Sequence, residues 1–180
     1  MTHLASASAM TQGSVPTHET VDPTLFRGAL GLFATGVTIV TAAHPTNGLI
    51  GITANSFNSV SLDPPLVLFS VANTARSLAA FLEAPGFVVN VLRQDQKILS
   101  GRFARQGEDK WAGVPYTPGR LGAPILPDTM AAFDCVHYAQ YEGGDHLIIV
   151  GRVVGMEHNV EGDPLLFYRG RYRALGDEIA

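Results

Sequence analysis

Residues 52–65, ITANSFNSVSLDPP, are rich in short hydrogen-bonding side chains, although they lie between the apolar runs LIGI and LVLFSV. A phosphate group or a flat heteroaromatic ring can be held by backbone N–H groups and short hydroxyls at strand ends. The side chains that could supply such contacts are Thr53, Asn55, Ser56 and Ser59. Taken alone, the same residues also fit an ordinary strand-to-turn connection.

A second group of candidate residues lies in the segment SVANTARS, residues 70–77. Asn73 or Thr74 can cap a following helix, and the N-terminus of a helix attracts anions. Arg76 and Ser77 would add a charge and a hydroxyl. The alternative interpretation is a capping residue beside a solvated arginine.

His146 follows the Gly-rich turn EGGD and begins an apolar stretch. Its ring could point into a cleft, and the alternative is an exposed turn histidine. Near the C-terminus, residues 167–172, FYRGRY, combine aromatic and arginine side chains. These could stack on a ring or simply cover the end of a barrel.

The usual motifs of nucleotide-binding and catalytic sites are missing from the sequence. It has no G-x-G-x-x-G fingerprint, P-loop, G-x-S-x-G elbow or H-E-x-x-H motif. The six histidines show no ligand spacing, so we expect no metal site. An enzyme with this sequence would therefore depend on a bound cofactor for the difficult chemical step.

Composition narrows the classes of protein that fit. A chain of 180 residues suits one domain, and its low charged fraction of 16% suggests that a second copy covers part of the surface. The net charge of −4 and the lack of a basic cluster argue against nucleic-acid binding. No apolar run is long enough to span a membrane. Cys135, the only cysteine, excludes an intrachain disulfide and is expected to pack as a small hydrophobic residue.

The first 22 residues are rich in Ser, Thr and Ala and lack the basic and apolar regions of a secretory signal. We expect residues 1–22 to be a flexible tail, residues 23–180 to be one domain, and the protein to be cytoplasmic.

Hydrophobic patterning predicts a mainly β chain. A helix should begin at Asp22-Pro23, carry apolar residues from Leu25 to Phe33 on one face and end near Gly36. Strands are expected at 37–43, 49–53, 65–71, 87–92, 130–141 and 146–158, helices at 73–84 and 94–104, and a long ordered loop or lid at 107–129. Six or more strands with hairpin connections predict a closed or nearly closed antiparallel barrel.

Several segments together carry a family resemblance. They are FRGALGLFATGVTIVT, GITANSFNSVSLDPPLVLFSV, NTARS, FVVNVL, GDH and PLLFYRGRY, in this order. The chain resembles the short-chain flavin reductases, which are the reductase components of two-component flavin-dependent monooxygenases. The resemblance extends from about Leu25 to Leu175.

This resemblance implies a six-stranded antiparallel split β-barrel with Greek-key topology and a few flanking helices, which binds FMN or FAD and forms a homodimer. NADH, or NADPH, would transfer a hydride from nicotinamide C4 to flavin N5. The reduced flavin would then diffuse to a separate oxygenase component. Such a reaction requires close stacking and hydrogen bonds but no covalent side-chain catalysis, which agrees with the missing nucleophile.

The resemblance also implies roles for individual residues. Those expected along the flavin are Thr35, Gly36, Val37 and Thr38, and those expected at its ring and ribityl chain are Thr53, Ala54, Asn55, Ser56, Ser70 and Val71. The phosphate would be held by Asn73, Arg76 and Ser77. The side on which NADH docks would be formed by His146, Tyr168, Arg169, Gly170 and Tyr172. His146 would orient the nicotinamide or assist protonation as the catalytic residue.

Trp111 stands where the family often has Phe, which could alter packing over the ring, and the N-terminal tail is longer than the family core requires. Two other readings stay open. One is a flavoprotein oxidase of the pyridoxamine-phosphate oxidase type with tightly held FMN, and the other is a non-catalytic flavin-binding protein.

Overall fold

The computed structural model describes residues 20–107 and 109–178, so most of the tail expected at residues 1–22 lies outside the described residues. The domain boundary at residue 23 stays a prediction. The helices are α1 (Pro23–Leu30), α2 (Leu78–Glu83), η1 (Gln94–Gln96) and α3 (Lys97–Phe103). The strands are β1 (Thr35–Gly36), β2 (Thr38–His44), β3 (Gly48–Ala54), β4 (Asn58–Leu62), β5 (Pro65–Ala72), β6 (Gly86–Val91), β7 (Thr117–Pro118), β8 (Pro124–Ile125), β9 (Ala131–Gly143), β10 (His146–His158), β11 (Leu166–Tyr168) and β12 (Arg171–Arg173).

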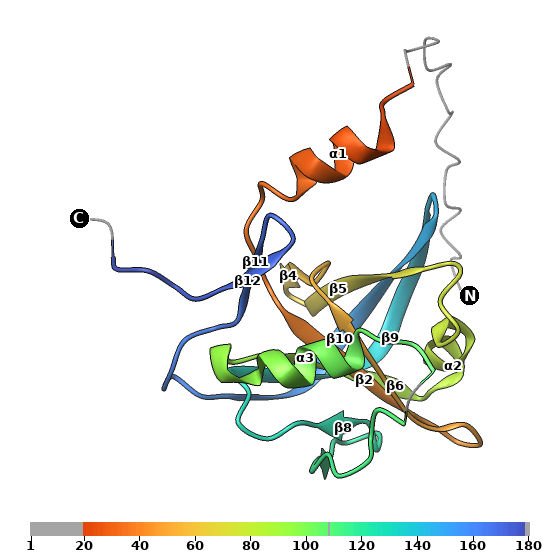
Figure 1. The fold of residues 1–180 in the computed structure, drawn as a ribbon. Coiled ribbons are helices and arrows are strands. Elements are labelled where there is room, and N and C mark those ends of the chain that lie inside the picture. Colours follow the sequence, from red (N-terminus) through yellow and green to blue (C-terminus); the bar gives the residue numbers. More distant parts are fainter. Residues whose placement is uncertain (1–19, 108, 179–180) are drawn as a thin grey trace.

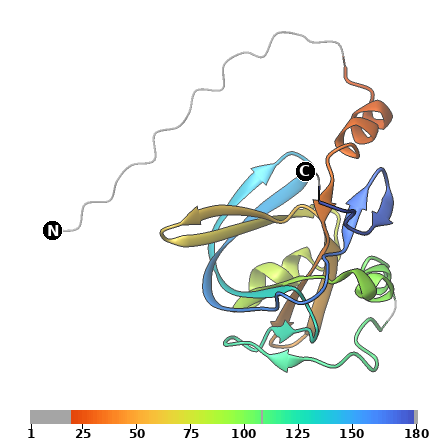
Figure 2. The ribbon, with the colours of Figure 1, turned by 90° about the vertical axis from the view of Figure 1, so that its left-hand side faces the viewer.

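Seven antiparallel strands form the main sheet, in the order β3-β2-β6-β9-β10-β5-β4 (Figure 1). Figure 2 shows the sheet curling strongly, with the long β9–β10 hairpin rising along one side. The ends of the sheet do not pair, so the barrel remains split. The prediction of a mainly β, antiparallel split barrel is confirmed, and β4 is an additional short strand at its edge.

The interior of the barrel is filled by aromatic and branched side chains. Phe69 of β5 lies edge-on to Phe87 of β6 at 5.0 Å and to Phe81 of α2 at 5.9 Å between ring centroids. Gly151 of β10 makes room for Phe87, because a Cβ at this position would lie 2.4 Å from the end of that ring. Cys135 is fully buried in β9, as predicted. This core packs against β3 and β5, whose C-terminal ends line the candidate site.

The N-terminal helix begins as predicted but is shorter than expected. The Asp22 carboxylate accepts the N–H groups of Thr24 and Leu25 at 2.8 and 2.9 Å, which fixes the first turn. The helix ends at Leu30, so the prediction that it continues to Gly36 is wrong. The chain must leave the helix early because Thr35 and Gly36 pair with β11. None of the residues of α1 is buried, and the helix stands away from the barrel (Figures 1 and 2).

The helix expected at residues 73–84 is also shorter, because α2 begins only at Leu78. Asn73 and Thr74 do not cap it, and Ser77 at the capping position makes no side-chain capping bond. The predicted helix over residues 94–104 is confirmed as η1 followed by α3. The first turn expected of α2 is instead a chain of turns that approaches the β9–β10 hairpin.

The loop predicted at residues 107–129 is ordered wherever it is described, and it carries the small β7–β8 pair. Two buried polar side chains of the barrel hold it in place. Asn90 of β6 accepts the N–H of Leu126 at 2.9 Å, and Thr41 of β2 donates to Pro124 O at 2.5 Å. At the beginning of this loop, Lys110 is held beside β3 by a hydrogen bond from its Nζ to Gly51 O at 3.2 Å.

Candidate functional site

The candidate site is a cavity of about 440 Å³, called the main cavity below, bounded by β3, β5, the 72–77 turn, the end of α3 and His146. It brings together predicted residues from four separate parts of the sequence. They are Thr53, Ala54, Asn55, Ser56, Ser70, Val71, Arg76, Ser77 and His146. Ligand pockets of small molecules commonly measure about 300 to 1,000 Å³, so this volume suits a cofactor.

The polar residues after β3 have structural partners as well as a place in the wall. The Ser56 hydroxyl accepts the Ser70 N–H at 2.9 Å and donates to Ser70 O at 3.2 Å, which joins the loop after β3 to β5. The Thr53 hydroxyl donates to Ser100 O of α3 at 2.6 Å. These bonds hold the wall rigid and leave oxygen lone pairs for a ligand. Ser59, which could have joined this group, lies exposed in β4 and does not line the cavity.

Asn73 lies beside the cavity without lining it. Its side-chain amide donates to Gly144 O at 3.0 Å, and its backbone N–H donates to Asp145 O at 2.9 Å. Asn73 therefore anchors the turn to the tip of the β9–β10 hairpin instead of capping α2. This attachment fixes the distance between Arg76 and His146, which lie on opposite elements of the cavity wall.

His146 is the first residue of β10 and is partly exposed. Its Nδ1 lies 2.7 Å from Oδ1 of Asp145. A carboxylate only accepts hydrogen bonds, so Nδ1 carries the proton and Nε2 is the nitrogen left for a ligand. The same hydrogen bond lowers the pKa of the Asp145 carboxyl below its ordinary value, and the charge of His146 adds to this effect.

Segment 35–38, expected along the ring, does not line the main cavity of its own chain. Thr35 and Gly36 form β1, which pairs with β11, while Val37 and Thr38 are buried. The Thr38 hydroxyl donates to Ala54 O at 2.8 Å, so it supports the cavity wall from behind.

Residues 168–172, which were expected on the side where NADH docks, also lie outside the main cavity. Arg169 and Gly170 line a hollow beside α1, and the Arg169 N–H donates to Gly31 O at 2.8 Å. The Arg169 guanidinium lies 5.3 Å from the ring centre of Tyr168. The Tyr172 hydroxyl lies 2.8 Å from Ser100 Oγ of α3, and Tyr172 does not line the main cavity. Within one chain, none of these residues joins His146.

Sequence reasoning missed the part of the wall formed by the end of α3 and the loop after it. The residues concerned are Phe103, Ala104, Arg105, Gln106, Gly107 and Lys110. Lys110 donates from Nζ to Phe103 O at 2.9 Å and to Gly51 O at 3.2 Å, so it ties α3 to β3. Burial lowers the pKa of its ammonium group. The only signal in the sequence was the Gly- and Pro-rich loop at 107–129.

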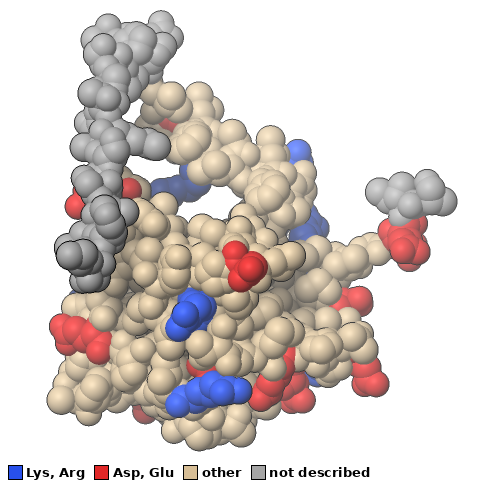
Figure 3. Space-filling model, turned by 180° about the vertical axis from the view of Figure 1, so that it is seen from behind, with Lys and Arg blue, Asp and Glu red and all other residues tan. Residues whose placement is uncertain are grey.

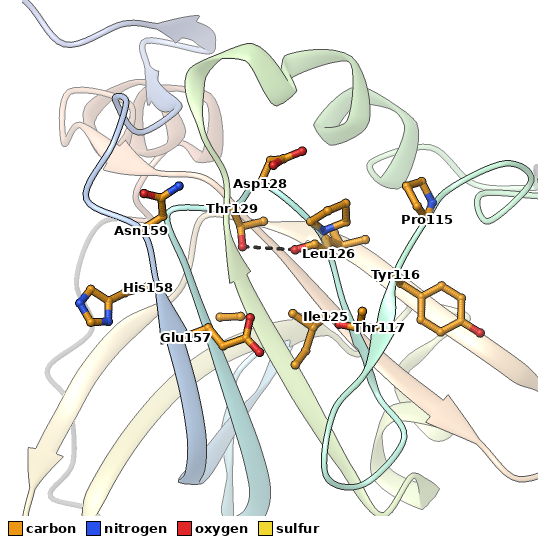
Figure 4. Close-up of a pocket in the computed structure, with 12 residues that line it drawn as sticks. Pro115, Tyr116, Thr117, Ile125, Leu126, Asp128, Thr129, Glu157, His158 and Asn159 are labelled. Carbon is orange, nitrogen blue, oxygen red and sulfur yellow. Dashed lines mark hydrogen bonds between the residues drawn. The ribbon is translucent and has the colours of Figure 1, made fainter.

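A separate cavity of about 400 Å³ lies between the β7–β8 loop and the ends of β9 and β10 (Figure 4). It is lined by Tyr116, Asp128, Glu157 and their neighbours, and the Thr129 hydroxyl donates to Leu126 O at 3.4 Å along its edge. No predicted site residue lines it. The main cavity is therefore the better candidate for the functional site.

Two observations concern the described ranges 20–107 and 109–178 as a whole. No group of three or more His, Cys, Asp or Glu side chains is placed to hold a metal ion there. The helices in this part of the chain are all too short or too polar to cross a membrane.

Comparison with known proteins identifies the family. Residues 30–176 match the family described as flavin reductase like domain. The chain belongs to this family. Among its relatives, the FMN reductase (NADH) SmoA of Agrobacterium fabrum is 48% identical over 147 residues, covering 82% of this chain and 83% of the relative. The resemblance inferred from the sequence segments is thereby confirmed.

Two further flavin reductase relatives span most of the chain. The reductase subunit HsaB of a flavin-dependent monooxygenase from Rhodococcus jostii is 43% identical over 158 residues, covering 87% of this chain and 80% of the relative. The solved structure of the NADH:FAD oxidoreductase SgcE6 of Streptomyces globisporus, in complex with NAD and FAD fragments, superposes with a TM-score of 0.83 at 36% identity. That match covers 91% of this chain and 100% of the other.

Proposed function

We propose that this protein is an NADH-dependent flavin reductase that transfers a hydride to FMN or FAD and supplies the reduced flavin to a separate monooxygenase. NADPH is the alternative reductant. The observation that carries the proposal is the main cavity, where residues 53–56, the 72–77 turn and His146 surround one ligand-sized space. The relatives named above act as reductases of flavin or as reductase subunits of monooxygenases.

The lining of the main cavity fits a flavin. Residues 53–56 have short side chains, so a flat ring can approach the backbone of β3 closely. Arg76, Ser77 and Lys110 place two positive charges and a hydroxyl at one end, which suits a phosphate. Lys110 pairs with no carboxylate within the described part of the chain. A partly buried ammonium group without a carboxylate partner suits the binding of a phosphate.

When bound, the flavin supplies the hydride-accepting atom N5, which takes hydride from nicotinamide C4. The protein's own part is to position the flavin and the nicotinamide and to exclude water from between them. Thr53 and Ser56 are held by hydrogen bonds to Ser100 and Ser70, so their oxygens are fixed before the ligand arrives. Asp145 keeps the proton of His146 on Nδ1, which leaves Nε2 to accept a hydrogen bond from the nicotinamide amide or from water.

The protein is further proposed to act as a homodimer. Several large apolar side chains of α1 and the turn after it are exposed, among them Leu25 at 74% and Phe33 at 75%. Apolar residues concentrated in this way mark an interaction surface. Figure 3 shows that, on the face seen from behind, uncharged residues make up most of the surface and charged side chains are scattered among them.

A second copy would also account for the predicted residues that lie outside the main cavity. Arg169 and Gly170 line the hollow beside α1, where the apolar surface is exposed, and Thr35 and Gly36 pair with the neighbouring strand β11. We propose that they contribute to the site of the partner copy. The proposed reductant, NADH, favours a cytoplasmic location.

A spectrophotometric assay tests the proposed reaction. Purified protein is mixed with NADH or NADPH and with FMN or FAD, and the loss of the nicotinamide absorbance band is followed. We expect consumption that increases with the concentration of free flavin. No consumption with either flavin and either nicotinamide would overturn the proposal and leave a flavin-binding protein. Turnover that depends on an added organic substrate and is insensitive to free flavin would instead indicate an oxidase of the pyridoxamine-phosphate oxidase type.

A further inference from the structure

A second hollow of about 350 Å³, called the side cavity below, adjoins the main cavity. Three residues line both spaces, namely Arg76, Ser77 and Lys110. Strand β3 also runs past both, because Leu49 to Gly51 face the side cavity and Ile52 to Ala54 face the main cavity. A single elongated ligand lying along β3 could therefore occupy the two spaces at once.

The junction between the two cavities is positively charged. Lys110 uses two hydrogen bonds to hold Phe103 O and Gly51 O, and an ammonium group has three N–H donors, so one remains for a ligand. Arg76 is exposed at the same place. In the described part of the chain, neither cation forms an ion pair with a carboxylate. Two cations and the Ser77 hydroxyl suit a pyrophosphate, which carries two adjacent negative charges.

Beyond the junction, the side cavity is lined by the apolar and aromatic residues Leu49 and Trp111 and by the polar residues Asn47 and Asp109. The Asp109 carboxylate accepts the backbone N–H of Trp111 at 3.1 Å, so it is engaged by the loop itself. The indole ring of Trp111 is held edge-on against Phe103 at 4.9 Å and Tyr116 at 5.7 Å between ring centroids. A fixed aromatic ring with a neighbouring carboxamide offers stacking and hydrogen bonds to a nucleobase.

The order of these groups along β3 is that of a flavin dinucleotide: a slot for a flat ring, a pyrophosphate junction and a base site. We propose that the side cavity binds the adenosine half of FAD, with the pyrophosphate between Arg76 and Lys110, so that FAD is preferred over FMN. This inference rests on the proposed function. NADH contains the same adenosine diphosphate group, but FAD is favoured because the side cavity continues the wall assigned to the flavin.

Binding measurements on the purified, flavin-free protein test the preference directly. Quenching of flavin fluorescence gives the Kd values of FMN and FAD in the dark, without NADH and hence without turnover. We expect FAD to bind at least about tenfold more tightly than FMN, a difference of about 1.4 kcal/mol. Equal affinity, or tighter binding of FMN, would overturn the inference without any variant.

Substitution in the side cavity then locates the effect. Leu49→Glu replaces an apolar residue of the proposed adenosine site by a carboxylate, and Ile98→Glu makes the same change on α3 at a side chain that is 87% exposed and lines neither cavity. We expect Leu49→Glu to weaken FAD binding about tenfold and to leave FMN binding within about twofold, and Ile98→Glu to change neither. Circular dichroism checks that both variants are folded.

Two other results of these experiments would overturn the inference. Equal weakening of FMN and FAD by Leu49→Glu would show that the side cavity does not discriminate the adenosine. A raised KM for NADH with unchanged FAD affinity, measured with FMN as acceptor, would assign the side cavity to NADH and overturn the inference. If no flavin supports NADH oxidation, the proposed function itself fails, whereas flavin reduction without an FAD preference contradicts only this inference.

Discussion

The Ser56 hydroxyl and the Ser70 backbone are joined by two hydrogen bonds, in which Ser56 Oγ accepts the Ser70 N–H at 2.9 Å and donates to Ser70 O at 3.2 Å. This pair closes the end of the main cavity between β3 and β5. The Ser56 side chain thus provides hydrogen-bond partners for the backbone of β5 and also fixes the wall that faces the ligand. Both roles require short hydroxyl side chains in this loop.

Replacing Ser56 by Ala should affect stability and binding together. The substitution leaves the Ser70 N–H and C=O without their partner, and we expect a loss of about 1 to 3 kcal/mol in the free energy of unfolding. Flavin affinity should fall as well, because the loop is no longer fixed. Chemical denaturation and fluorescence titration measure the two effects. Ser59→Ala, in the exposed strand β4, is the matched control and should change neither.

Replacing His146 by Ala should reduce turnover more than flavin affinity. Its Nε2 is the nitrogen available to the nicotinamide, while the flavin is held chiefly by the other walls. Loss of one positioned hydrogen-bonding or proton-transferring group is expected to lower kcat/KM for NADH by about 100-fold. Steady-state kinetics with varied NADH would measure this. Unchanged NADH kinetics would contradict the role, and His158→Ala, an exposed histidine outside the main cavity, serves as control.

The pairing of Asp145 with His146 predicts a shifted titration of the Asp145 carboxyl. The hydrogen bond from His146 lowers the pKa of the Asp145 carboxyl, so the pairing is fully present above the ordinary carboxyl pKa of about 3.9. It is lost as the pH falls through the lowered value. An NMR titration of Asp145 should therefore have its midpoint below the ordinary value in the wild type and move up in His146→Ala. An identical midpoint in both proteins would contradict the pairing.

The exposed apolar surface of α1 predicts the oligomeric state. The double substitution Leu25→Glu and Phe33→Glu places charges on two side chains that are 74% and 75% exposed. We expect the dimer to dissociate, since charges are unfavourable at the core of an interface. Analytical ultracentrifugation measures the mass. Val160→Glu, at a residue that is 85% exposed outside α1, should leave the dimer intact, and a wild-type monomer would contradict the proposal.

Cys135 predicts a decline of stability at alkaline pH. Burial raises the pKa of its thiol to about 12 in the folded protein, whereas an unfolded cysteine ionises at about 8.5. Above the unfolded value the folded chain binds more protons, so the free energy of unfolding falls as the pH rises. Cys135→Ala should be less stable at pH 8 because it loses core packing, but its stability should fall less between pH 8 and 10. An equally steep decline in denaturation experiments would contradict this explanation.

The sequence by itself predicted the local elements and the family. Alternating and continuous apolar runs predicted the strands, and Asp22 predicted the start of α1, because these signals depend on neighbouring residues only. Residues 53–56, which the sequence singled out as a ligand-contacting group, line one cavity, and their contact with a flavin stays a prediction. The segments that carry the resemblance, read together rather than one by one, gave the flavin reductase assignment, which the family match confirms.

Other features were decided only by contacts between distant residues. Asn73 has the side chain of a helix cap, but the tip of the β9–β10 hairpin takes up both its amide and its N–H, so α2 begins later. In the sequence, Lys110 is a single charged residue in a long loop. Only the packing of that loop against β3 and α3 places Lys110 at the junction of the two cavities. These hydrogen bonds join residues of different elements, and which elements meet depends on the packing of the whole chain, which local sequence patterns do not encode.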